Sequence, residues 1–214
     1  MSQRPATGME RWQRIARRIR VPLGFLAAAL FLVDLGRTAP RPAAIAWSLA
    51  LVLPGLWLRG WASGCVRKDR ELTTAGPYAY TRNPLYLGSI LIAAGFCLSV
   101  LSWPLAVVLA AGFALVYIPV IASEERFLRA AFPAFDAYSR QVPRLLPRLT
   151  SARAAGGHPP AARGSLVTGA RNSWFSLDLY RKHREYNAVL GAALLYLSLL
   201  FLHPALAAIF HGTR

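Results

Sequence analysis

Cysteine and acidic residues are scarce in this chain of 214 residues. It has 2 cysteines, and 9 Asp and Glu stand against 25 Lys and Arg, so the formal net charge is +16. Cys65 and Cys97 provide neither a disulfide framework nor a paired metal-binding motif. The four histidines are scattered, with no two at the spacing of metal ligands: His158, His183, His203 and His211. We therefore expect no metal site.

Charged residues make up only 16% of the chain, whereas 55% of it is hydrophobic, which is apolar for a soluble domain. A charge of +16 would also suit a nucleic-acid-binding protein, but the arginines bracket apolar runs instead of forming one basic stripe. Such bracketing is typical of the positive-inside pattern of membrane proteins. The composition predicts an all-α, polytopic helical membrane protein with no nucleic-acid partner.

The apolar runs predict about five transmembrane helices and cytoplasmic interfacial helices. The expected spans are residues 21–36, 43–61, 84–101, 104–122 and 187–210. Pro204 is expected to kink the last of them. The basic stretch at 9–20 has apolar residues at helical spacing, which indicates either an amphipathic helix on an anionic leaflet or a frayed basic tail.

Four parts follow from this pattern. They are a basic amphipathic helix at 1–20, a four-span core at 21–149, a linker rich in Gly, Pro, Ala and Arg at 150–171, and an interfacial helix with the fifth span at 172–214. With five spans, the most basic segments fall on one side, which should be cytoplasmic. We expect a cytoplasmic N-terminus, an external C-terminus and a location in a bacterial inner membrane.

Two polar segments are expected to meet at the cytoplasmic end of one helical hairpin. GPYAYTRNPLYLG, residues 76–88, leads into the third apolar run, and SEERFLRAAF, residues 123–132, follows the fourth. Four of their side chains should be close in space: Arg82, Tyr86, Glu124 and Glu125. Ionisable residues clustered at a membrane border are by default a functional-site hypothesis.

Each of these residues also has a purely structural interpretation. Asn83 followed by Pro84 is a good helix start, with Asn as the N-cap and Pro in the first turn. Glu125 and Arg129 have the spacing of an ordinary i, i+4 ion pair. The tyrosines suit an aromatic belt at the membrane interface, and Arg82 alone suits a positive-inside charge.

The two segments together resemble the isoprenylcysteine carboxyl methyltransferase and phospholipid N-methyltransferase superfamily. The resemblance is carried by LTTAGPYAYTRNPLYLG and, one hairpin later, by EERFLRAAFPAFDAYSRQVPRLLP, and it covers about residues 67–148. It implies an integral-membrane methyltransferase that uses S-adenosylmethionine from the cytosol and a lipophilic acceptor from the bilayer. The lack of a glycine-rich strand-to-helix loop agrees, because it argues against a Rossmann-type methyltransferase.

The resemblance also implies a set of site residues. The family's Arg-x-Pro-x-Tyr element falls on Arg82, Pro84 and Tyr86, and later aromatic, proline and basic positions fall on Tyr138, Pro143 and Arg144. The implied cofactor-binding residues are Arg70, Gly76, Tyr78, Arg82, Asn83, Pro84, Tyr86, Glu124 and Glu125. The implied catalytic residues are Arg82, Tyr86 and Glu125.

Four positions depart from the isoprenylcysteine branch. That branch has His where this chain has Asn83 and commonly another His at Arg70, while Phe135 replaces a Tyr and Pro133 a Gly. An Asn-Pro pair is familiar from the phospholipid branch. The acceptor therefore stays open between a phospholipid amine and an isoprenylcysteine-type carboxylate.

The cofactor carries an ammonium and a carboxylate, so it needs both acidic and basic partners. Glu124 or Glu125 suits the ammonium, and Arg82 suits a carboxylate, which it can bind bidentately. An amine acceptor would need a base, for which Glu125 is the candidate, whereas a carboxylate acceptor would need none. Two other functions remain open: a non-enzymatic membrane scaffold or sensor, and a membrane reductase that uses NADPH.

Overall fold

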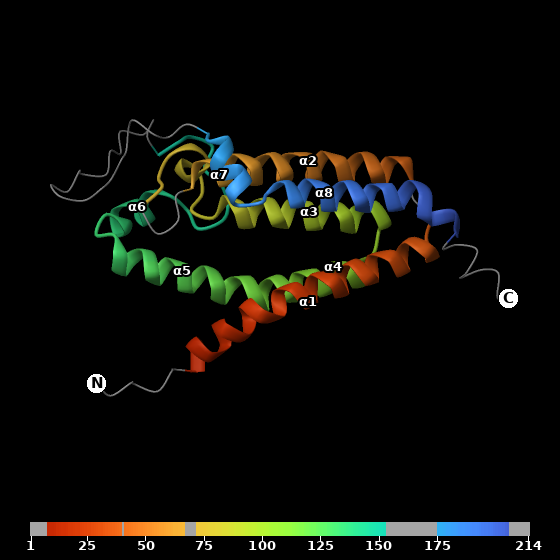
Figure 1. Ribbon diagram of the computed structural model, residues 1–214, viewed down its shortest axis with the longest axis horizontal. Helices are drawn as coiled ribbons and strands as arrows, with labels where there is room; N and C mark the ends of the chain where they lie inside the picture. The colour runs from red at the N-terminus through yellow and green to blue at the C-terminus, as the bar shows by residue number, and fades with distance from the viewer. Residues whose placement is uncertain (1–7, 40, 67–71, 153–174, 206–214) are drawn as a thin grey trace. The chain divides into compact units, whose positions relative to one another are not determined.

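Every regular element in the described part of the chain is helical (Figure 1). The structure, a computed structural model, describes residues 8–39, 41–66, 72–152 and 175–205, and for residues 8–21 it describes the backbone alone. Three helices are long and apolar enough to cross a membrane: Pro42–Cys65, Trp103–Ala131 and Tyr186–Ala205. The helix Pro84–Val100 is apolar but shorter. The prediction of an all-α protein is confirmed within these ranges.

The described part of the chain contains eight α-helices. In chain order they are α1 (Gly8–Arg37), α2 (Pro42–Cys65), α3 (Pro84–Val100), α4 (Trp103–Gly112), α5 (Ile118–Ala131), α6 (Phe135–Gln141), α7 (Leu177–Lys182) and α8 (Tyr186–Leu197). A 3-10 turn at Gly76–Ala79 precedes α3. One π-helical turn, Phe113–Tyr117, joins α4 to α5, and another, Ser198–Leu202, follows α8 shortly before Pro204.

Two helices are longer than the sequence predicts. The expected N-terminal helix at 1–20 and the span from residue 21 lie, in their described part, on one helix, because α1 is continuous from Gly8 to Arg37 with Pro22 inside it. The fourth span was expected to end at Ala122, but the helix runs on to Ala131. Residues 123–131 are mostly good helix formers, and the stop comes only from Pro133, which disfavours helix at the residue before it.

Local signals explain where the other helices begin. Pro84 is the first residue of α3, where its missing N–H costs nothing. Ser102 caps α4, because its hydroxyl accepts a hydrogen bond from the N–H of Leu105 at 3.2 Å. Ser176 does the same for α7 by accepting from the N–H of Leu179 at 3.4 Å. The predicted helix start at Pro84 is confirmed to the residue.

The chain divides into two compact units. The first unit comprises Met1–Ser48, Phe96–Arg126 and Tyr196–Arg214. In its described part, α1 packs against α4 and the π-helical turn after it. Ser102 bonds to the carboxylate of Asp34, and Nδ1 of His203 lies 2.8 Å from the carbonyl oxygen of Leu35. The first contact ties the start of α4 to α1, and the second ties the end of the last helix to α1.

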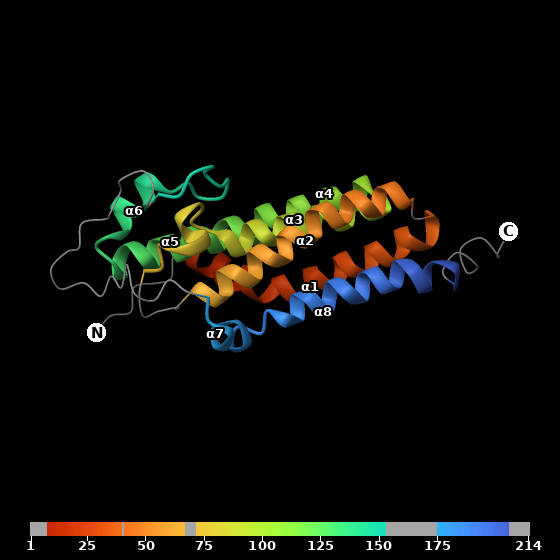
Figure 2. The same cartoon turned by 90° about the horizontal axis from the view of Figure 1, so that it is seen from above.

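The second unit, Leu49–Gly95 and Phe127–Leu195, holds the motif that begins α3. Here α2 and α3 approach each other at two glycines. A Cβ on Gly55 would lie 2.9 Å from the carbonyl oxygen of Gly88, and a Cβ on Gly88 would lie 2.7 Å from that of Gly55. Small residues are what allow such a close backbone approach between membrane helices. Figures 1 and 2 both show α7 at the C-terminal end of α2.

Candidate active site

The predicted motif forms a compact loop before α3. The 3-10 turn Gly76–Ala79 opens it, and Gly76 has a φ of +61° that L side chains rarely adopt. Tyr78 is buried and packs with Ala62 and Cys65, two residues in the last turn of α2. The motif loop, residues 76–83, therefore lies at the end of a helix that is long and apolar enough to span a membrane.

A distant segment holds the motif loop through its backbone carbonyls. Three successive carbonyls, at residues 143–145, each accept a hydrogen bond from the motif loop. The bonds run from Arg82 N–H to Pro143 O at 2.9 Å, from Asn83 Nδ2 to Arg144 O at 2.8 Å and from Thr81 Oγ1 to Leu145 O at 3.0 Å. The loop segment Pro143–Thr150 is thus joined edge to edge with the loop that carries Arg82.

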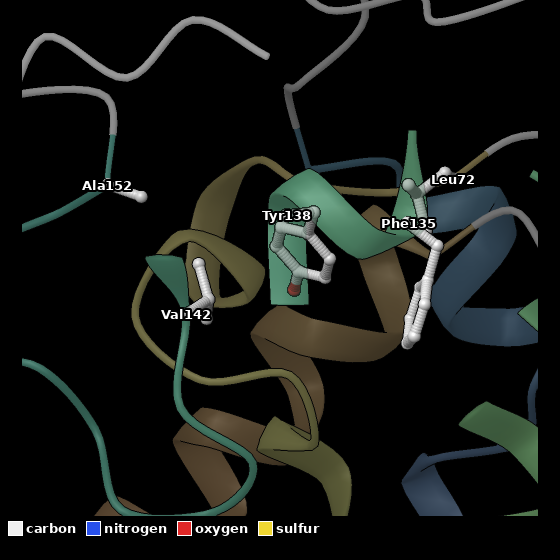
Figure 3. Packing of buried hydrophobic residues seen from close by; sticks show 5 residues of the cluster. All are labelled: Leu72, Phe135, Tyr138, Val142 and Ala152. Carbon is white, nitrogen blue, oxygen red and sulfur yellow. The ribbon is translucent and has the colours of Figure 1, made fainter. Parts of the chain in front are cut away.

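Helix α6, which precedes this segment, also holds the motif loop. Its Tyr138 hydroxyl donates to the carbonyl oxygen of Tyr78 at 2.8 Å, and both residues are buried. Figure 3 shows the apolar cluster around it, in which Phe135 and Tyr138 of α6 lie with Leu72, Val142 and Ala152. The N–H of Ala152 donates to the carbonyl of Ala79 at 3.1 Å. Ala152, in the segment that the sequence assigned to a linker, is therefore part of the folded core, and residues 153–171 of that linker lie outside the described residues.

The predicted site residues fall into two groups. Gly76, Tyr78, Arg82, Asn83, Pro84 and Tyr86 all lie in the second unit, on the motif loop or the first turn of α3. Arg82 and Tyr86 are half-buried, and Nε of Arg82 is enclosed by protein. Asn83 directly precedes α3, as the helix-start interpretation requires, and its side-chain Nδ2 donates a hydrogen bond to the carbonyl oxygen of Arg144.

The acidic pair lies on α5, in the first unit. Glu125 is only 5% exposed, and Glu124 is half-buried. Arg129, one turn further on, pairs with Asp136 of α6 through a contact of 2.8 Å between Nε and Oδ1. The approach of the acidic pair to Arg82 stays a prediction from the sequence, and Arg70 lies outside the described residues.

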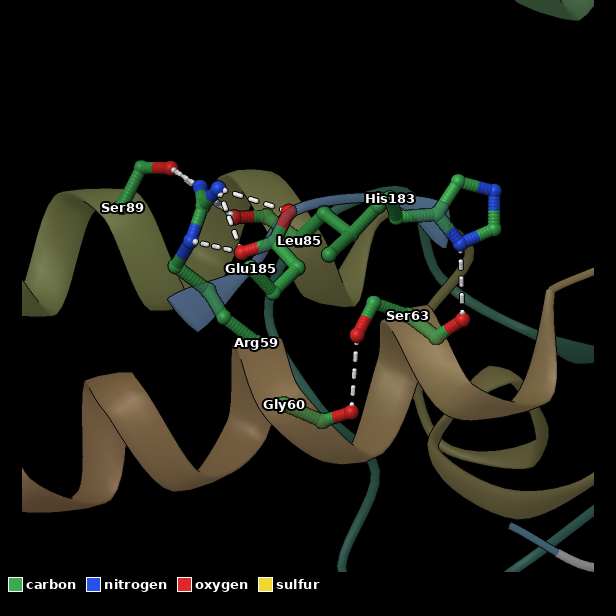
Figure 4. A network of polar contacts seen from close by, with 7 residues as sticks. All are labelled: Arg59, Gly60, Ser63, Leu85, Ser89, His183 and Glu185. Atoms are coloured by element: carbon green, nitrogen blue, oxygen red, sulfur yellow. Dashed lines mark hydrogen bonds and ion pairs between the residues drawn. The ribbon is translucent and has the colours of Figure 1, made fainter. Parts of the chain in front are cut away.

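An ion pair that the sequence did not suggest lies close to the first turn of α3 (Figure 4). Arg59 of α2 binds Glu185 through two parallel hydrogen bonds of 3.0 Å each, and their side chains are 24% and 11% exposed. The same guanidinium also reaches the carbonyl of Leu85 and the hydroxyl of Ser89 on α3. Arg59 thus links α2, α3 and the residue just before α8.

The C-terminal segment also caps α2. The last four carbonyls of a helix have no partner within it. At the end of α2, the N–H of Ser176 donates to the carbonyl of Gly64 at 2.9 Å, and Nδ1 of His183 lies 3.0 Å from that of Ser63. The ring of Phe175 covers Gly64 so closely that a Cβ there would lie 2.3 Å from it. Spacing alone could not reveal this docking, because more than a hundred residues separate the partners.

These contacts create a rigid polar corner at one end of the second unit. It offers the guanidinium of Arg82 and tyrosine side chains, whereas the buried carboxylate of Glu125 belongs to α5 in the first unit. Within the described ranges, His, Cys, Asp and Glu form no group of three or more that could hold a metal ion. The residue types suit recognition of a molecule that carries both charges.

The helices of the described residues, three of them long and apolar enough to cross a membrane, define the class of the molecule as a helical integral membrane protein. Residues 45–134 match the phospholipid methyltransferase family, so the family resemblance is confirmed for that part of the chain. The match includes the motif loop and the acidic pair. It ends before Tyr138 and the loop that receives the motif.

Two curated relatives are similar over a shorter stretch. The cobalt-zinc-cadmium resistance protein CzcN of Cupriavidus metallidurans is 43% identical over 95 residues, which are 44% of this chain and 43% of that protein. The nickel-cobalt-cadmium resistance protein NccN of Alcaligenes xylosoxydans xylosoxydans is 43% identical over 95 residues, 44% of each protein. The matched stretch is thus less than half the length of either relative. No solved structure matches the chain.

Proposed function

We propose that the chain is an integral-membrane methyltransferase that uses S-adenosylmethionine and acts on a lipid-like acceptor. The observation that carries the proposal is the seating of Thr81, Arg82 and Asn83 on three successive carbonyls. It fixes the backbone of the family's motif at the end of a membrane-spanning helix. We further propose five spans, with the N-terminus and the active site facing the cytosol of a bacterium.

The available side chains fit the proposed cofactor. When bound, S-adenosylmethionine supplies a methyl group on a positively charged sulfur, and it also carries a carboxylate and an ammonium. Arg82 would bind the carboxylate, because a guanidinium matches it bidentately. Glu124 or Glu125 would accept hydrogen bonds from the ammonium, and the two roles are interchangeable. The other proposed contacts are Arg70, Gly76, Tyr78, Asn83, Pro84 and Tyr86.

The acceptor decides what else the protein must do. A phospholipid amine has to lose a proton, and the carboxylate of Glu125 would receive it. The burial of Glu125 supports this role, since a carboxylate away from bulk water would meet the acceptor rather than solvent. A carboxylate acceptor needs no base, and Arg82 would then orient it beside Tyr86.

Binding of S-adenosylmethionine to the purified chain in detergent tests the proposal. Wild type should bind it saturably, and Arg82→Ala should weaken binding about tenfold or more, as expected for the loss of hydrogen bonds to a charged group. Glu124→Ala should also weaken binding. Arg126→Ala, which removes an exposed arginine next to the acidic pair, should not. Absence of saturable binding by wild type contradicts the proposal.

The names of the two relatives support a second candidate, a contribution to metal-ion tolerance of the cell. A membrane scaffold or sensor that retains the fold without turnover would serve this role through its structure alone. Growth in cobalt or cadmium separates the two candidates. If cells carrying Arg82→Ala together with Glu124→Gln and Glu125→Gln tolerate the metals as well as wild type, the role is non-enzymatic. Loss of tolerance supports methyl transfer, provided that the membrane contains as much of the variant as of the wild-type protein.

A further inference from the structure

Leu146 and Leu149 are unusually exposed for large apolar side chains. They are 77% and 101% exposed, and they lie in the loop after α6 rather than on a spanning helix. Exposure of helical leucines to lipid is expected in a membrane protein, but it does not account for a loop. Apolar side chains that stand out together in this way mark an interaction surface.

The loop that carries them is firmly held. The N–H of Arg148 donates to the carbonyl of Tyr80 at 3.0 Å, and its Nη1 donates to that of Gln141 at 2.6 Å. Leu145 accepts from Thr81, as described above. Pro143 and Pro147 restrict the backbone between these bonds. The exposure of the two leucines is therefore built into a fixed loop.

The position of the loop places it at a membrane surface. Its partners Tyr80 and Thr81 directly precede α3, and the neighbouring Tyr78 packs on the last turn of α2. Because α2 is long and apolar enough to span the bilayer, its end marks the level of the lipid head groups. The loop bonded to that end lies at the same level.

The charge of the segment indicates which surface it fits. Residues 137–152 contain three arginines and no acidic residue, and Arg140 and Arg144 are exposed. Arginines beside exposed apolar side chains are typical of elements that lie in the interface of an anionic leaflet. Apolar side chains alone would fit a protein partner equally well, whereas this charge complements anionic phosphates.

We propose that the loop Pro143–Thr150 docks onto the anionic leaflet of the protein's own membrane. Leu146 and Leu149 insert among the acyl chains, and the arginines of the segment lie at the level of the phosphates. Docking brings the motif loop to the head groups, so that a lipid acceptor reaches Arg82 without leaving the bilayer. This consequence rests on the proposed methyl transfer, whereas the docking itself does not.

Depth measurements on the full chain test the docking. Leu146→Cys, Leu149→Cys and the control Gln141→Cys are labelled with an environment-sensitive fluorophore, with unsubstituted protein as the background. The proteins are placed in nanodiscs of phosphatidylcholine with or without phosphatidylglycerol. Quenching by doxyl-labelled lipid reports insertion, and quenching by acrylamide reports contact with water.

The proposal predicts at least twofold stronger doxyl quenching for the labels at 146 and 149 than for the label at 141. It also predicts that phosphatidylglycerol increases that quenching. Acrylamide quenching equal to that of the control overturns the docking, and so does protection from acrylamide without doxyl quenching, which would indicate a second copy or another protein. Equal quenching with and without phosphatidylglycerol overturns the anionic assignment. None of these measurements requires turnover, so a failure of the docking proposal can be distinguished from a failure of the proposed methyl transfer.

Discussion

Gly76 is the residue at which the motif loop takes a left-handed backbone conformation, with a φ of +61°. A Cβ at this position would also lie 3.1 Å from Sγ of Cys65. Gly76→Ala should therefore cost about 1–2 kcal/mol through the backbone conformation alone. Thermal unfolding in detergent measures this cost. Gly24→Ala, with no atom within 4 Å of the added methyl, is the control, and an equal change in both variants would contradict the prediction.

Tyr138 contributes a single buried hydrogen bond to the motif loop, from its hydroxyl to the carbonyl of Tyr78. Tyr138→Phe should destabilise the protein by about 1–2 kcal/mol, because it removes the donor from a buried carbonyl. If the bond also positions the loop, binding of S-adenosylmethionine should weaken several-fold. Tyr186→Phe, at an exposed tyrosine, should leave both quantities unchanged. Unchanged stability of Tyr138→Phe would show that the bond is dispensable.

At the scale of elements, the packing of α2 on α3 depends on two glycines. A Cβ on Gly88 would lie 2.7 Å from a backbone oxygen, which cannot move aside as a flexible side chain can. Gly88→Ala should therefore force the helices apart and lower the unfolding temperature. Gly191→Ala on α8, with open space around it, should be neutral or stabilising, since Ala favours helix by up to about 1 kcal/mol. If Gly88→Ala behaves like Gly191→Ala, the close approach is wrong.

The Arg59–Glu185 pair joins the C-terminal helix to the part of the chain that matches the family. Glu185→Gln leaves a half-buried guanidinium without its counter-charge, so we expect a loss of roughly 3 kcal/mol. Asp136→Asn breaks an ion pair whose side chains are 51% and 55% exposed, and it should cost less than about 1 kcal/mol. Chemical denaturation in detergent compares the two. Equal losses would mean that Glu185 is no more than a surface charge.

At the scale of the whole molecule, local sequence patterns predicted most of the helices and the start of α3. They could not predict contacts between segments that are distant in the sequence. The start of α3 follows from Asn83-Pro84, and the tyrosines of the motif could be placed from the same residues. Apolar periodicity shows which face of a helix is buried but not which partner covers it. The sequence therefore gave no sign that Glu185, 126 residues away, pairs with Arg59. The extension of α5 was missed because its polar residues suggested an interface rather than a continued helix.

The number of spans decides on which side of the membrane the C-terminus lies, and it depends on α1 and α3, the two expected spans that are not among the three longer apolar helices. The 17 residues of α3 extend about 26 Å, slightly less than the hydrocarbon thickness of about 30 Å. The difference disappears if the bilayer thins locally, or if the side chains of Arg82 and the tyrosines at the start of α3 reach outward to the head groups. With both α1 and α3 spanning, in addition to the three longer apolar helices, the count is five, and a fluorescent protein fused to the N-terminus should glow in the cytosol.

Alkaline phosphatase, which is active only outside the cytosol, should then be active when fused after Arg214. A fluorescent protein fused at the same position should stay dark, because the basic loops keep the opposite side in the cytosol. Bright fluorescence there would mean an even number of spans, with either α1 or α3 failing to cross. The first case leaves the motif loop at the start of a spanning helix, and the second does not. A further fusion in the turn between α1 and α2 separates the two cases, because that turn lies outside the cytosol only if α1 crosses, and so tests the placement of Arg82 at the start of a span.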